Sequence, residues 1–235
     1  MRKKTSRSKK LRVVFLLQRR LLAWYARHKR DLPWRRTSDP YHILVSEIML
    51  HQTQVDRVAP KFEQFVAKYP TVHALAQAPL PELKKIWYPL GYNYRPARLR
   101  SIARESIAKY NGRIPDRYED LIAMEGVGRY TAGAVLSFAY NKDEPTLDTN
   151  VARVLARVFG VRGDLAKAQA QKRLWRLAAD VIPTGQSSDF NQGMMDLGAT
   201  ICVARKPRCP VCPVRTSCRS YPTFARRHDI AKNGR

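Results

Sequence analysis

Residues 121–155 read LIAMEGVGRYTAGAVLSFAYNKDEPTLDTNVARVL, and the fold prediction starts from them. Gly126 and Gly128 stand one residue apart between two stretches whose apolar residues recur at helical spacing. Glycine adopts backbone conformations that other residues avoid, and the first N–H groups of a helix lie at the positive end of its dipole. The stretch therefore predicts a hairpin between two helices that can bind phosphate.

Taken alone, the same stretch has a simpler interpretation. A Gly-Val-Gly is typical of a plain turn between helices, and Asp148 is typical of an N-cap for the amphipathic helix that follows it. The functional interpretation therefore depends on the rest of the chain.

The charge of the chain indicates a polyanionic partner. Its 235 residues include 44 Lys and Arg against 19 Asp and Glu, a formal net charge of +25 with a pI near 10.5. Such an excess predicts salt-sensitive binding to nucleic acid. No apolar run approaches the ~20 residues that span a bilayer. The basic start and apolar residues 13–17 resemble a signal peptide only briefly, without a cleavage site. We expect a monomer without membrane association, cytoplasmic, and nucleoid-associated if prokaryotic.

Helical periodicity dominates the chain. Residues 11–28 predict a helix after a disordered basic N-terminus at 1–10, and no stretch alternates as a strand would. The sequence therefore predicts an all-α protein.

Glu47 interrupts an apolar helical pattern over residues 41–50. Ile43 lies four residues before it and Leu50 three after it, so its carboxyl shares their face. A carboxyl on an apolar face can hold its proton near neutral pH, as a general acid must. The alternative is a Glu at the edge of that face, reaching water or capping a neighbouring helix.

Aromatic and basic residues are interleaved in two segments. Trp34 and Arg35 could be a core anchor beside a surface charge, or a stacking face for a base. Residues 87–96 form an aromatic loop that leads into Arg95, Arg98, Arg100 and Arg104. This combination fits phosphate contact plus base stacking, although a solvated helix face explains the arginines equally well.

Cysteines occur only at the C-terminal end, in the spacing C-x6-C-x2-C-x5-C. Zinc sites usually pair two short Cys knuckles, and here only the middle pair has that spacing. The longer arms favour a [4Fe–4S] cluster. Basic residues inside the loops suggest that the cluster stiffens a DNA-binding segment, while an electron carrier is the alternative. The four cysteines are Cys202, Cys209, Cys212 and Cys218.

Together these motifs resemble the helix–hairpin–helix DNA glycosylases with an iron–sulfur loop, and within them the MutY-type adenine glycosylases. The matching motifs are Leu-Pro-Trp-Arg at 32–35, Ser-Glu-Ile-Met-Leu-His-Gln-Thr-Gln-Val at 46–55, Leu-Gly-Tyr at 90–92, Gly-Val-Gly-Arg-Tyr-Thr-Ala-Gly at 126–133, Leu-Asp-Thr-Asn-Val at 147–151 and Phe-Asn-Gln-Gly-Met-Met-Asp-Leu-Gly at 190–198.

The resemblance implies a helix–hairpin–helix glycosylase fold of two parts. A six-helix barrel domain would span 32–147, and residues 11–31 with 148–220 would form a helical [4Fe–4S] domain. A basic tail would follow at 221–235. The active site would lie in the cleft between the two domains.

The resemblance also assigns a reaction. Glu47 would protonate the departing adenine at N7 and then handle the attacking water. Asp148 would stabilise oxocarbenium character in the sugar, and Tyr130 and Asn150 would orient these groups. Strand-cleaving members of the superfamily carry lysine where this chain has Tyr130. The resemblance therefore implies a monofunctional enzyme of base excision repair that leaves an abasic site.

Further residues match the family's DNA contacts. Gln52 and Tyr92 match the wedges that hold a duplex open while a base is flipped. The residues matching the adenine pocket are Arg30, Trp34, Arg35, Val55 and Gln192. The remaining expected DNA contacts are Thr53, Leu90, Gly126, Val127, Gly128 and Arg129.

The expected partner is double-stranded DNA with a mismatch, adenine opposite 8-oxoguanine or guanine. A thymine or uracil glycosylase acting on T·G or U·G is the alternative, and a non-catalytic helix–hairpin–helix module with an iron–sulfur cluster is another. A strand-cleaving lyase is disfavoured, since no lysine stands near Tyr130. The departures from the family pattern are His51, Glu125, Thr149, the pair Asn93-Tyr94, and the short sequence after Cys218, where the family usually carries an 8-oxoguanine-recognition domain.

Overall fold

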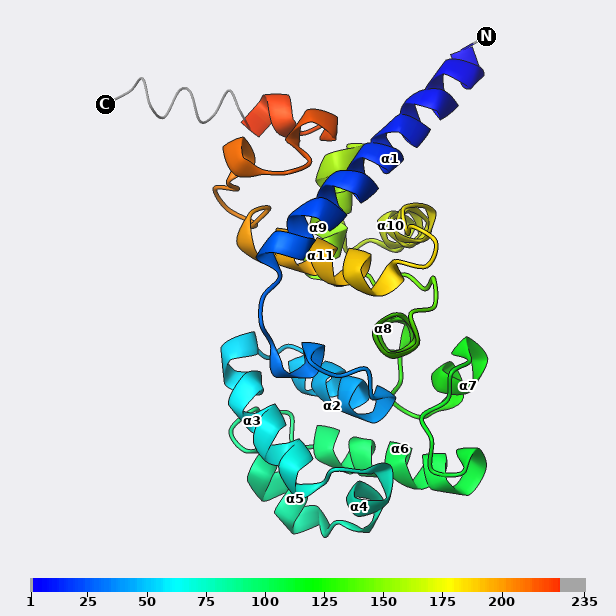
Figure 1. Ribbon diagram of the computed structural model, residues 1–235, viewed down its shortest axis with the longest axis vertical. Coiled ribbons are helices and arrows are strands. Elements are labelled where there is room, and N and C mark those ends of the chain that lie inside the picture. The colour runs from blue at the N-terminus through cyan, green and yellow to red at the C-terminus, as the bar shows by residue number, and fades with distance from the viewer. Residues whose placement is uncertain (1, 225–235) are drawn as a thin grey trace, which may run out of the picture. The chain divides into compact units, whose positions relative to one another are not determined.

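The computed structural model describes residues 2–224, with the backbone alone for residues 2–7 and 9 (Figure 1). Within these residues every regular element is a helix, so the all-α prediction is confirmed. None of the described helices combines the length and hydropathy that a membrane span requires. The basic tail at 225–235 lies outside the described residues.

The chain divides into two compact units. Residues Met1–Arg30 and Asp143–Arg235 form one, here called the terminal unit, and Asp31–Lys142 form the other, the central unit. Each has its own hydrophobic core.

The central unit is built around α2 (Pro40–Leu50), which packs against α8 (Arg129–Tyr140), α3 (Val55–Lys68) and α6 (Arg95–Tyr110). Asp39 caps α2 by accepting a hydrogen bond from Tyr41 N at 2.8 Å, and Pro40 begins the helix. Residues 43–49 are all buried, and a helix that is apolar nearly all round belongs inside a core. The other elements of this unit are η1 (Pro33–Arg35), α4 (Val72–Gln77), α5 (Leu80–Trp87) and α7 (Tyr118–Ala123).

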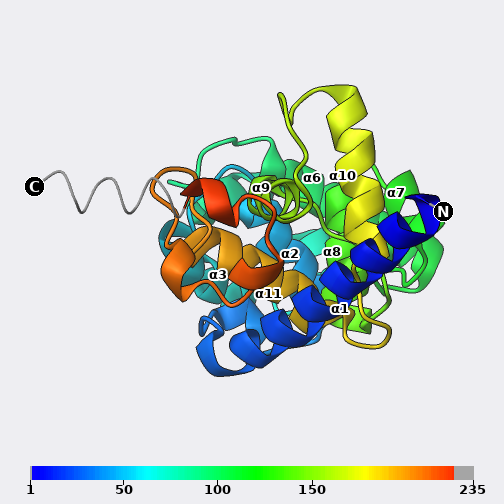
Figure 2. The same ribbon diagram turned by 90° about the horizontal axis from the view of Figure 1, so that it is seen from above.

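The terminal unit joins the two ends of the described chain. Its helices are α1 (Arg2–His28), α9 (Thr149–Phe159), α10 (Ala168–Asp180) and α11 (Ser187–Thr200), followed by the short turns η2 (Cys209–Val211) and η3 (Arg215–Ser217). α11 packs against both α1 and α9 (Figures 1 and 2). Gly198 makes the approach to α9 possible, since a Cβ there would lie 2.6 Å from Asn150 Cβ.

The start of α1 differs from the prediction. Residues 2–10 were expected to be disordered, but the helix begins at Arg2. No Gly or Pro interrupts residues 2–28, and an ion pair of 2.7 Å joins Lys10 to Asp180. Basic composition was therefore a poor guide to where this helix begins.

Candidate functional site

Glu47 is the buried carboxylate of α2. Glu47 is only 3% exposed. Most of its neighbours in α2 are apolar and belong to the core of the central unit. Just beyond α2, His51 Nε2 lies 3.2 Å from Thr131 Oγ1, and the His51 and Tyr130 ring centroids are 6.4 Å apart. The C-terminal end of the Glu47 helix therefore lies beside the first turn of α8, which carries the expected Tyr130.

The environment of His51 disfavours its charged form. Burial lowers the pKa of His51, and the positive charges of Arg95 and Arg98 lower it further. At neutral pH this side chain is therefore an uncharged link between the two helices.

The Gly-Val-Gly hairpin joins α7 to α8. Gly126 has φ +88°, and a Cβ at this position would lie 1.9 Å from Arg98 Cδ, so glycine is required here twice over. Val127 N donates to Met124 O at 3.1 Å, and its side chain is 4% exposed. Val127 therefore serves the turn and the core, and the N–H groups that could meet phosphate are those at the start of α8.

Arg95 holds two loops in place from inside the protein. The residue is 2% exposed, and its guanidinium donates six hydrogen bonds, all to neighbouring oxygens of the central unit. Nη1 donates to the carbonyls of Ile48, Met49 and His51 at 2.8–3.0 Å, and Nη2 donates to Thr53 Oγ1 and the carbonyls of Leu90 and Gly91 at 3.0–3.1 Å. Phosphate contact by Arg95, considered from the sequence, is therefore wrong. Arg95 instead holds the segments that carry Gln52 and Tyr92 in place.

The expected wedge residues are exposed, but a neighbour is not. Gln52 and Tyr92 are both at the surface with φ of 55° and 49°, in the left-handed region that bulky residues rarely adopt. Leu90 was expected to contact DNA, yet its side chain is 4% exposed and part of the core. An apolar side chain beside Trp87 gains more from burial than from solvent. The hydroxyl of Thr53 is engaged by Arg95.

Trp34 is a core residue rather than an open stacking face. It is 5% exposed, and its ring meets Phe62 edge-on at 5.7 Å. Of its two interpretations from sequence, the structure favours the core anchor. Arg35 beside it and Val55 at the start of α3 are both half-buried in the same unit.

In the terminal unit, Asp148 is the N-cap of α9. Its Oδ1 accepts from Val151 N at 2.6 Å, and its Oδ2 accepts from Asn150 Nδ2 at 3.0 Å. Asn150 Oδ1 accepts in turn from Arg153 Nη2 at 2.7 Å. Arg153 also donates to the carbonyl of Cys202 at 2.8 Å. One continuous set of hydrogen bonds therefore runs from the Asp148 carboxylate to the cysteine segment.

Two expected pocket residues of the terminal unit have defined partners. Gln192 Oε1 accepts from Tyr25 OH at 3.2 Å, and its Nε2 donates to Ser188 Oγ at 3.0 Å. Each amide atom still has a second hydrogen-bonding position. Arg30 Nε donates to the fully buried Asp196 at 2.6 Å, so its charge first serves an ion pair inside this unit.

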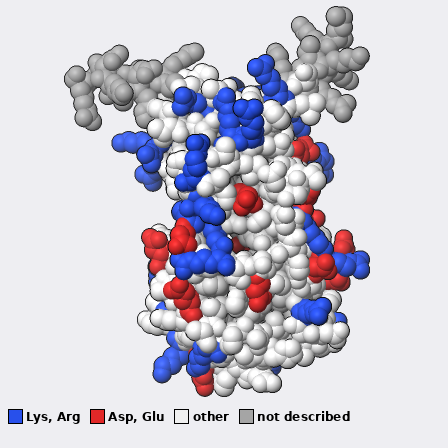
Figure 3. All heavy atoms as spheres, viewed as in Figure 1, with Lys and Arg blue, Asp and Glu red and all other residues white. Residues whose placement is uncertain are grey.

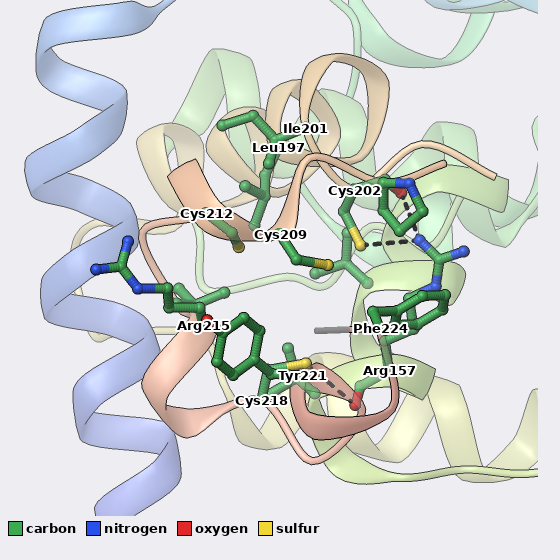
Figure 4. Close-up of a pocket in the computed structure, with 14 residues that line it drawn as sticks. Arg157, Leu197, Ile201, Cys202, Cys209, Cys212, Arg215, Cys218, Tyr221 and Phe224 are labelled. Carbon is green, nitrogen blue, oxygen red and sulfur yellow. Dashed lines mark hydrogen bonds between the residues drawn. The ribbon is translucent and has the colours of Figure 1, made fainter. Parts of the chain in front are cut away.

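The four cysteines line one pocket (Figure 4). All four are half-buried, and none forms a disulfide. Arg157 borders the pocket, and its Nη1 lies 3.3 Å from Cys202 Sγ. Burial raises the pKa of the Cys209 and Cys218 thiols and raises that of Cys212 to about 12, so metal binding would have to displace these protons.

The four thiols that line this pocket match the number of cysteines that bind a [4Fe–4S] cluster. Within the described part of the chain, no three His, Cys, Asp or Glu side chains are placed to hold one metal ion. A [4Fe–4S] cube binds each thiolate at a different iron, so it needs thiols around a cavity rather than around a point.

Charge is divided unequally over the chain. The terminal unit has 28 Lys and Arg against 8 Asp and Glu, whereas the central unit has 16 against 11. Figure 3 shows few acidic side chains among the basic ones over the terminal unit, and mixed signs over the central unit. Long-range attraction of a polyanion therefore comes mainly from the terminal unit.

Comparison with protein families matches residues 45–180 to the HhH-GPD superfamily of base excision DNA repair proteins. The chain belongs to this family. The matched residues contain Glu47, the hairpin, Tyr130 and Asp148. The resemblance recognised in the sequence is thus confirmed.

HhH-GPD relatives of this chain act on different bases according to their names. An adenine DNA glycosylase of Buchnera aphidicola subsp. Acyrthosiphon pisum is 37% identical over 87% of this chain and 59% of its own length, and that of Homo sapiens is 41% identical over 85% and 38%. A thymine-DNA glycosylase of Aeropyrum pernix is 39% identical over 87% of this chain and 94% of its own. The chain therefore spans only about half the length of these adenine relatives.

Solved structures of the superfamily confirm the fold. A thermostable thymine-DNA glycosylase matches with a TM-score of 0.82 and 35% identity, over 93% of this chain and 99% of that one. A trapped covalent intermediate of endonuclease III with DNA matches with a TM-score of 0.77 and 25% identity, over 91% and 97%.

The structural roles of three arginines were not predicted from the sequence. Arg95, Arg153 and Arg157 bond mainly to backbone carbonyls of segments distant in sequence. Only Arg153 and Arg157 had a local signal, because they lie four residues apart on the same helix that begins at Asp148. A solvated helix face would carry the same signal.

Proposed function

We propose that this chain is a monofunctional, mismatch-specific DNA glycosylase of base excision repair. It flips adenine opposite 8-oxoguanine or guanine out of double-stranded DNA and hydrolyses the N-glycosidic bond. The products are free adenine and an abasic site in an unbroken strand. The protein acts as a monomer, in the cytoplasm or at the nucleoid.

The observation that carries this proposal is the burial of Glu47. A carboxyl at 3% exposure within the apolar α2 costs folding free energy, which a module that only binds DNA has no reason to spend. A general acid has such a reason, because a carboxyl shielded from bulk water can transfer a proton directly to the departing base. Glu47 protonates adenine at N7 as the bond breaks and afterwards takes a proton from the attacking water.

Asp148 supplies the negative charge on the sugar side. Hydrogen bonds from Val151 N and Asn150 Nδ2 fix the direction of its carboxylate, so that it needs no rearrangement as oxocarbenium character develops. Glu47 and Asp148 would act on the same N-glycosidic bond, Glu47 on the base and Asp148 on the sugar.

Tyr130 supports hydrolysis without strand cleavage. A Schiff base to the sugar requires an amine, and the first turn of α8 begins Arg129-Tyr130-Thr131 without lysine. Without this amine the site favours hydrolysis by water, which leaves the DNA strand intact.

Adenine is favoured by Gln192 and by the adenine glycosylases among the relatives. The Gln192 amide is held by Tyr25 and Ser188 yet keeps one donor and one acceptor position for the polar edge of a base. Thymine opposite guanine is the second candidate. It is favoured by the thymine-DNA glycosylase of Aeropyrum pernix, of whose length this chain covers 94%.

We propose that Cys202, Cys209, Cys212 and Cys218 bind a [4Fe–4S] cluster, which would stiffen the loops that carry Lys206 and Arg208. Purified protein should be brown and absorb at roughly 400 nm, with about four irons per chain. One equivalent of zinc and no iron would contradict the cluster.

The test of the function compares four duplexes. A·8-oxoG, A·G, T·G and U·G duplexes are incubated with the purified chain, and strands are resolved with and without alkali. We expect alkali-dependent breaks at adenine only. Breaks at thymine but not adenine would select the second candidate, breaks without alkali would overturn the monofunctional assignment, and intact strands throughout would overturn a glycosylase.

A further inference from the structure

The loop after α5 presents an exposed pair of tyrosines. Tyr92 and Tyr94 are 48% and 56% exposed, although large aromatic side chains usually gain from burial. Their ring centroids are 6.3 Å apart with an interplanar angle of 78°, an edge-to-face pair. Tyr92 matches the family's wedge, whereas Asn93-Tyr94 departs from the family pattern. The second ring therefore has no assigned role.

Each ring is supported by an arginine. Arg95 Cζ lies 5.2 Å from the Tyr92 ring centroid and 5.3 Å from that of the buried Trp87. Arg98 Cζ lies 5.2 Å from the Tyr94 ring centroid. Cations at this distance from an aromatic face attract it and limit its rotation.

The support of Tyr94 also reaches the hairpin. The Arg98 side chain occupies the space beside Gly126, where a Cβ would lie 1.9 Å from its Cδ. The side chains of Tyr94 and Arg98 thus pack together against Gly126. The ring that departs from the family pattern is tied to the expected phosphate-binding turn.

The backbone of the loop is held in an uncommon conformation. Gly91 and Tyr92 have φ of +76° and +49°, and Arg95 N donates to Tyr92 O at 2.9 Å. The Arg95 guanidinium bonds the two carbonyls before Tyr92, those of Leu90 and Gly91. A non-glycine residue keeps such a conformation only when its surroundings enforce it. The backbone that carries Tyr92 is therefore held in this conformation by its own surroundings.

The chemistry of this surface indicates which kind of ligand would bind there. Two exposed rings backed by guanidinium groups suit a flat π-system that belongs to a polyanion, which describes an unstacked nucleic-acid base. Arg57 adds a further positive charge, since its Nη2 donates to Pro89 O at 2.8 Å in the same loop. An apolar protein partner would meet Arg57 and Arg98 beside the two rings.

We propose that Tyr94 is a second base-stacking residue, and that Tyr92 and Tyr94 form a two-ring platform for unpaired bases beside an extruded nucleotide. The proposal rests on the proposed function, since only a protein that opens a duplex exposes such bases. Because the rings are nearly perpendicular, each meets a different base. A fixed platform loses little conformational freedom on binding.

The test measures binding without requiring base release. The full chain and its Tyr94→Ala variant are titrated with a duplex that bears a tetrahydrofuran abasic analogue and 2-aminopurine next to it or opposite it. We expect Tyr94→Ala to raise Kd about 5- to 100-fold, as the loss of one base–aromatic stack does. Quenching of 2-aminopurine at one of the two positions should also be lost. Tyr94→Phe should retain both.

Phe15→Ala is the matched control, since Phe15 is 58% exposed on α1. It should bind like wild type. Tyr94→Ala that binds within twofold of wild type, or weakens a fully paired duplex by the same factor, would overturn the platform. Tyr94→Phe applies the same quenching test if Tyr94→Ala does not fold, and loss of quenching in Tyr94→Phe would equally overturn stacking. A wild type that binds the analogue but releases no base would refute the proposed function and leave the platform standing.

Discussion

The two units of this protein use arginine in opposite ways. The terminal unit carries a formal charge of +20 and the central unit +5, out of +25. In the terminal unit many arginines lie at the surface, including Arg205 and Arg208 in the cysteine segment. In the central unit the main functional arginine, Arg95, is inside the core and bonds carbonyls. The charge of the terminal unit attracts DNA, whereas the buried Arg95 of the central unit holds loops in place.

The two units contribute differently to DNA-binding affinity and to catalysis. The attraction between surface charge and DNA does not depend on the DNA sequence, and salt screens it. The terminal unit should therefore dominate the salt dependence of binding. The central unit holds Glu47, the hairpin and the aromatic platform, whose effects depend on geometry. Variants in the two units should therefore fail in different assays.

The largest expected effect is on chemistry in the central unit. Glu47→Gln removes the transferable proton but keeps nearly the same shape. Single-turnover base release from an A·8-oxoG duplex should fall by roughly 10²- to 10⁴-fold, the share of a general acid. Binding to the same duplex should stay within a few-fold. A fully active Glu47→Gln would remove Glu47 as the acid.

Next comes the stability of the central unit. Arg95→Ala leaves six oxygens without their donor, three of them buried and three part-buried, and we expect the free energy of unfolding to fall by about 3 kcal/mol or more. Arg100→Ala is the control, because the structure gives its guanidinium one hydrogen bond, to Ala78 O at 3.1 Å. It should lower that free energy by only about 1 kcal/mol. Equal losses in urea unfolding would refute the special role of Arg95.

In the terminal unit the sensitive contact is between α9 and α11. Gly198→Ala would place a Cβ 2.6 Å from Asn150 Cβ and 3.1 Å from its Cα, and should destabilise by about 1–3 kcal/mol. Base release should fall as well, because Asn150 orients Asp148. Gly128→Ala in the central unit meets open space and should cost less than about 1 kcal/mol. A neutral Gly198→Ala would show that the two helices can move apart freely.

How much was visible in the sequence differs between these sites. Glu47 and the cysteines were singled out because a carboxyl in an apolar stripe and four closely spaced thiols are local anomalies. Asp148 was singled out from the residues that follow it, and the roles of all these residues stay predictions. The role of Arg95 was not predicted, because two segments, 48–53 and 90–91, converge on its guanidinium only in the fold, and the first begins 47 residues before it. Leu90 and Trp34 were assigned to DNA by motif, and their burial depends on the same long-range packing.

A smaller effect separates the units by salt. Arg205→Ala with Lys206→Ala removes two exposed charges of the terminal unit, and Lys84→Ala with Lys85→Ala removes two from the central unit. The first pair should flatten the plot of log K against log salt concentration by about 0.9 for each lost phosphate contact. The second should change it little. Equal slopes in the two variants, measured by fluorescence anisotropy, would contradict the division of charge.

The smallest expected effect concerns pH. The pKa of His51 is lowered in the folded state from its ordinary 6.5, so below about pH 6.5 the unfolded chain binds the additional proton more readily. The free energy of unfolding should therefore fall as pH drops from 6.5 toward the lowered value. His51→Gln, which removes the titratable ring, should lose this component in urea titrations at pH 7 and pH 5. If the free energy of unfolding of His51→Gln changed between pH 7 and pH 5 as much as that of the wild type, His51 would not be the cause.

The central claim is that a buried acid in the central unit releases adenine. The direct measurement is mass spectrometry of the small molecules released from an A·8-oxoG duplex by the wild-type chain and by Glu47→Gln. Free adenine should appear in amounts equal to the abasic sites formed, with an unbroken strand, and should be nearly absent with Glu47→Gln. Adenine release by Glu47→Gln at the wild-type rate, or no free base from the wild type, would contradict it.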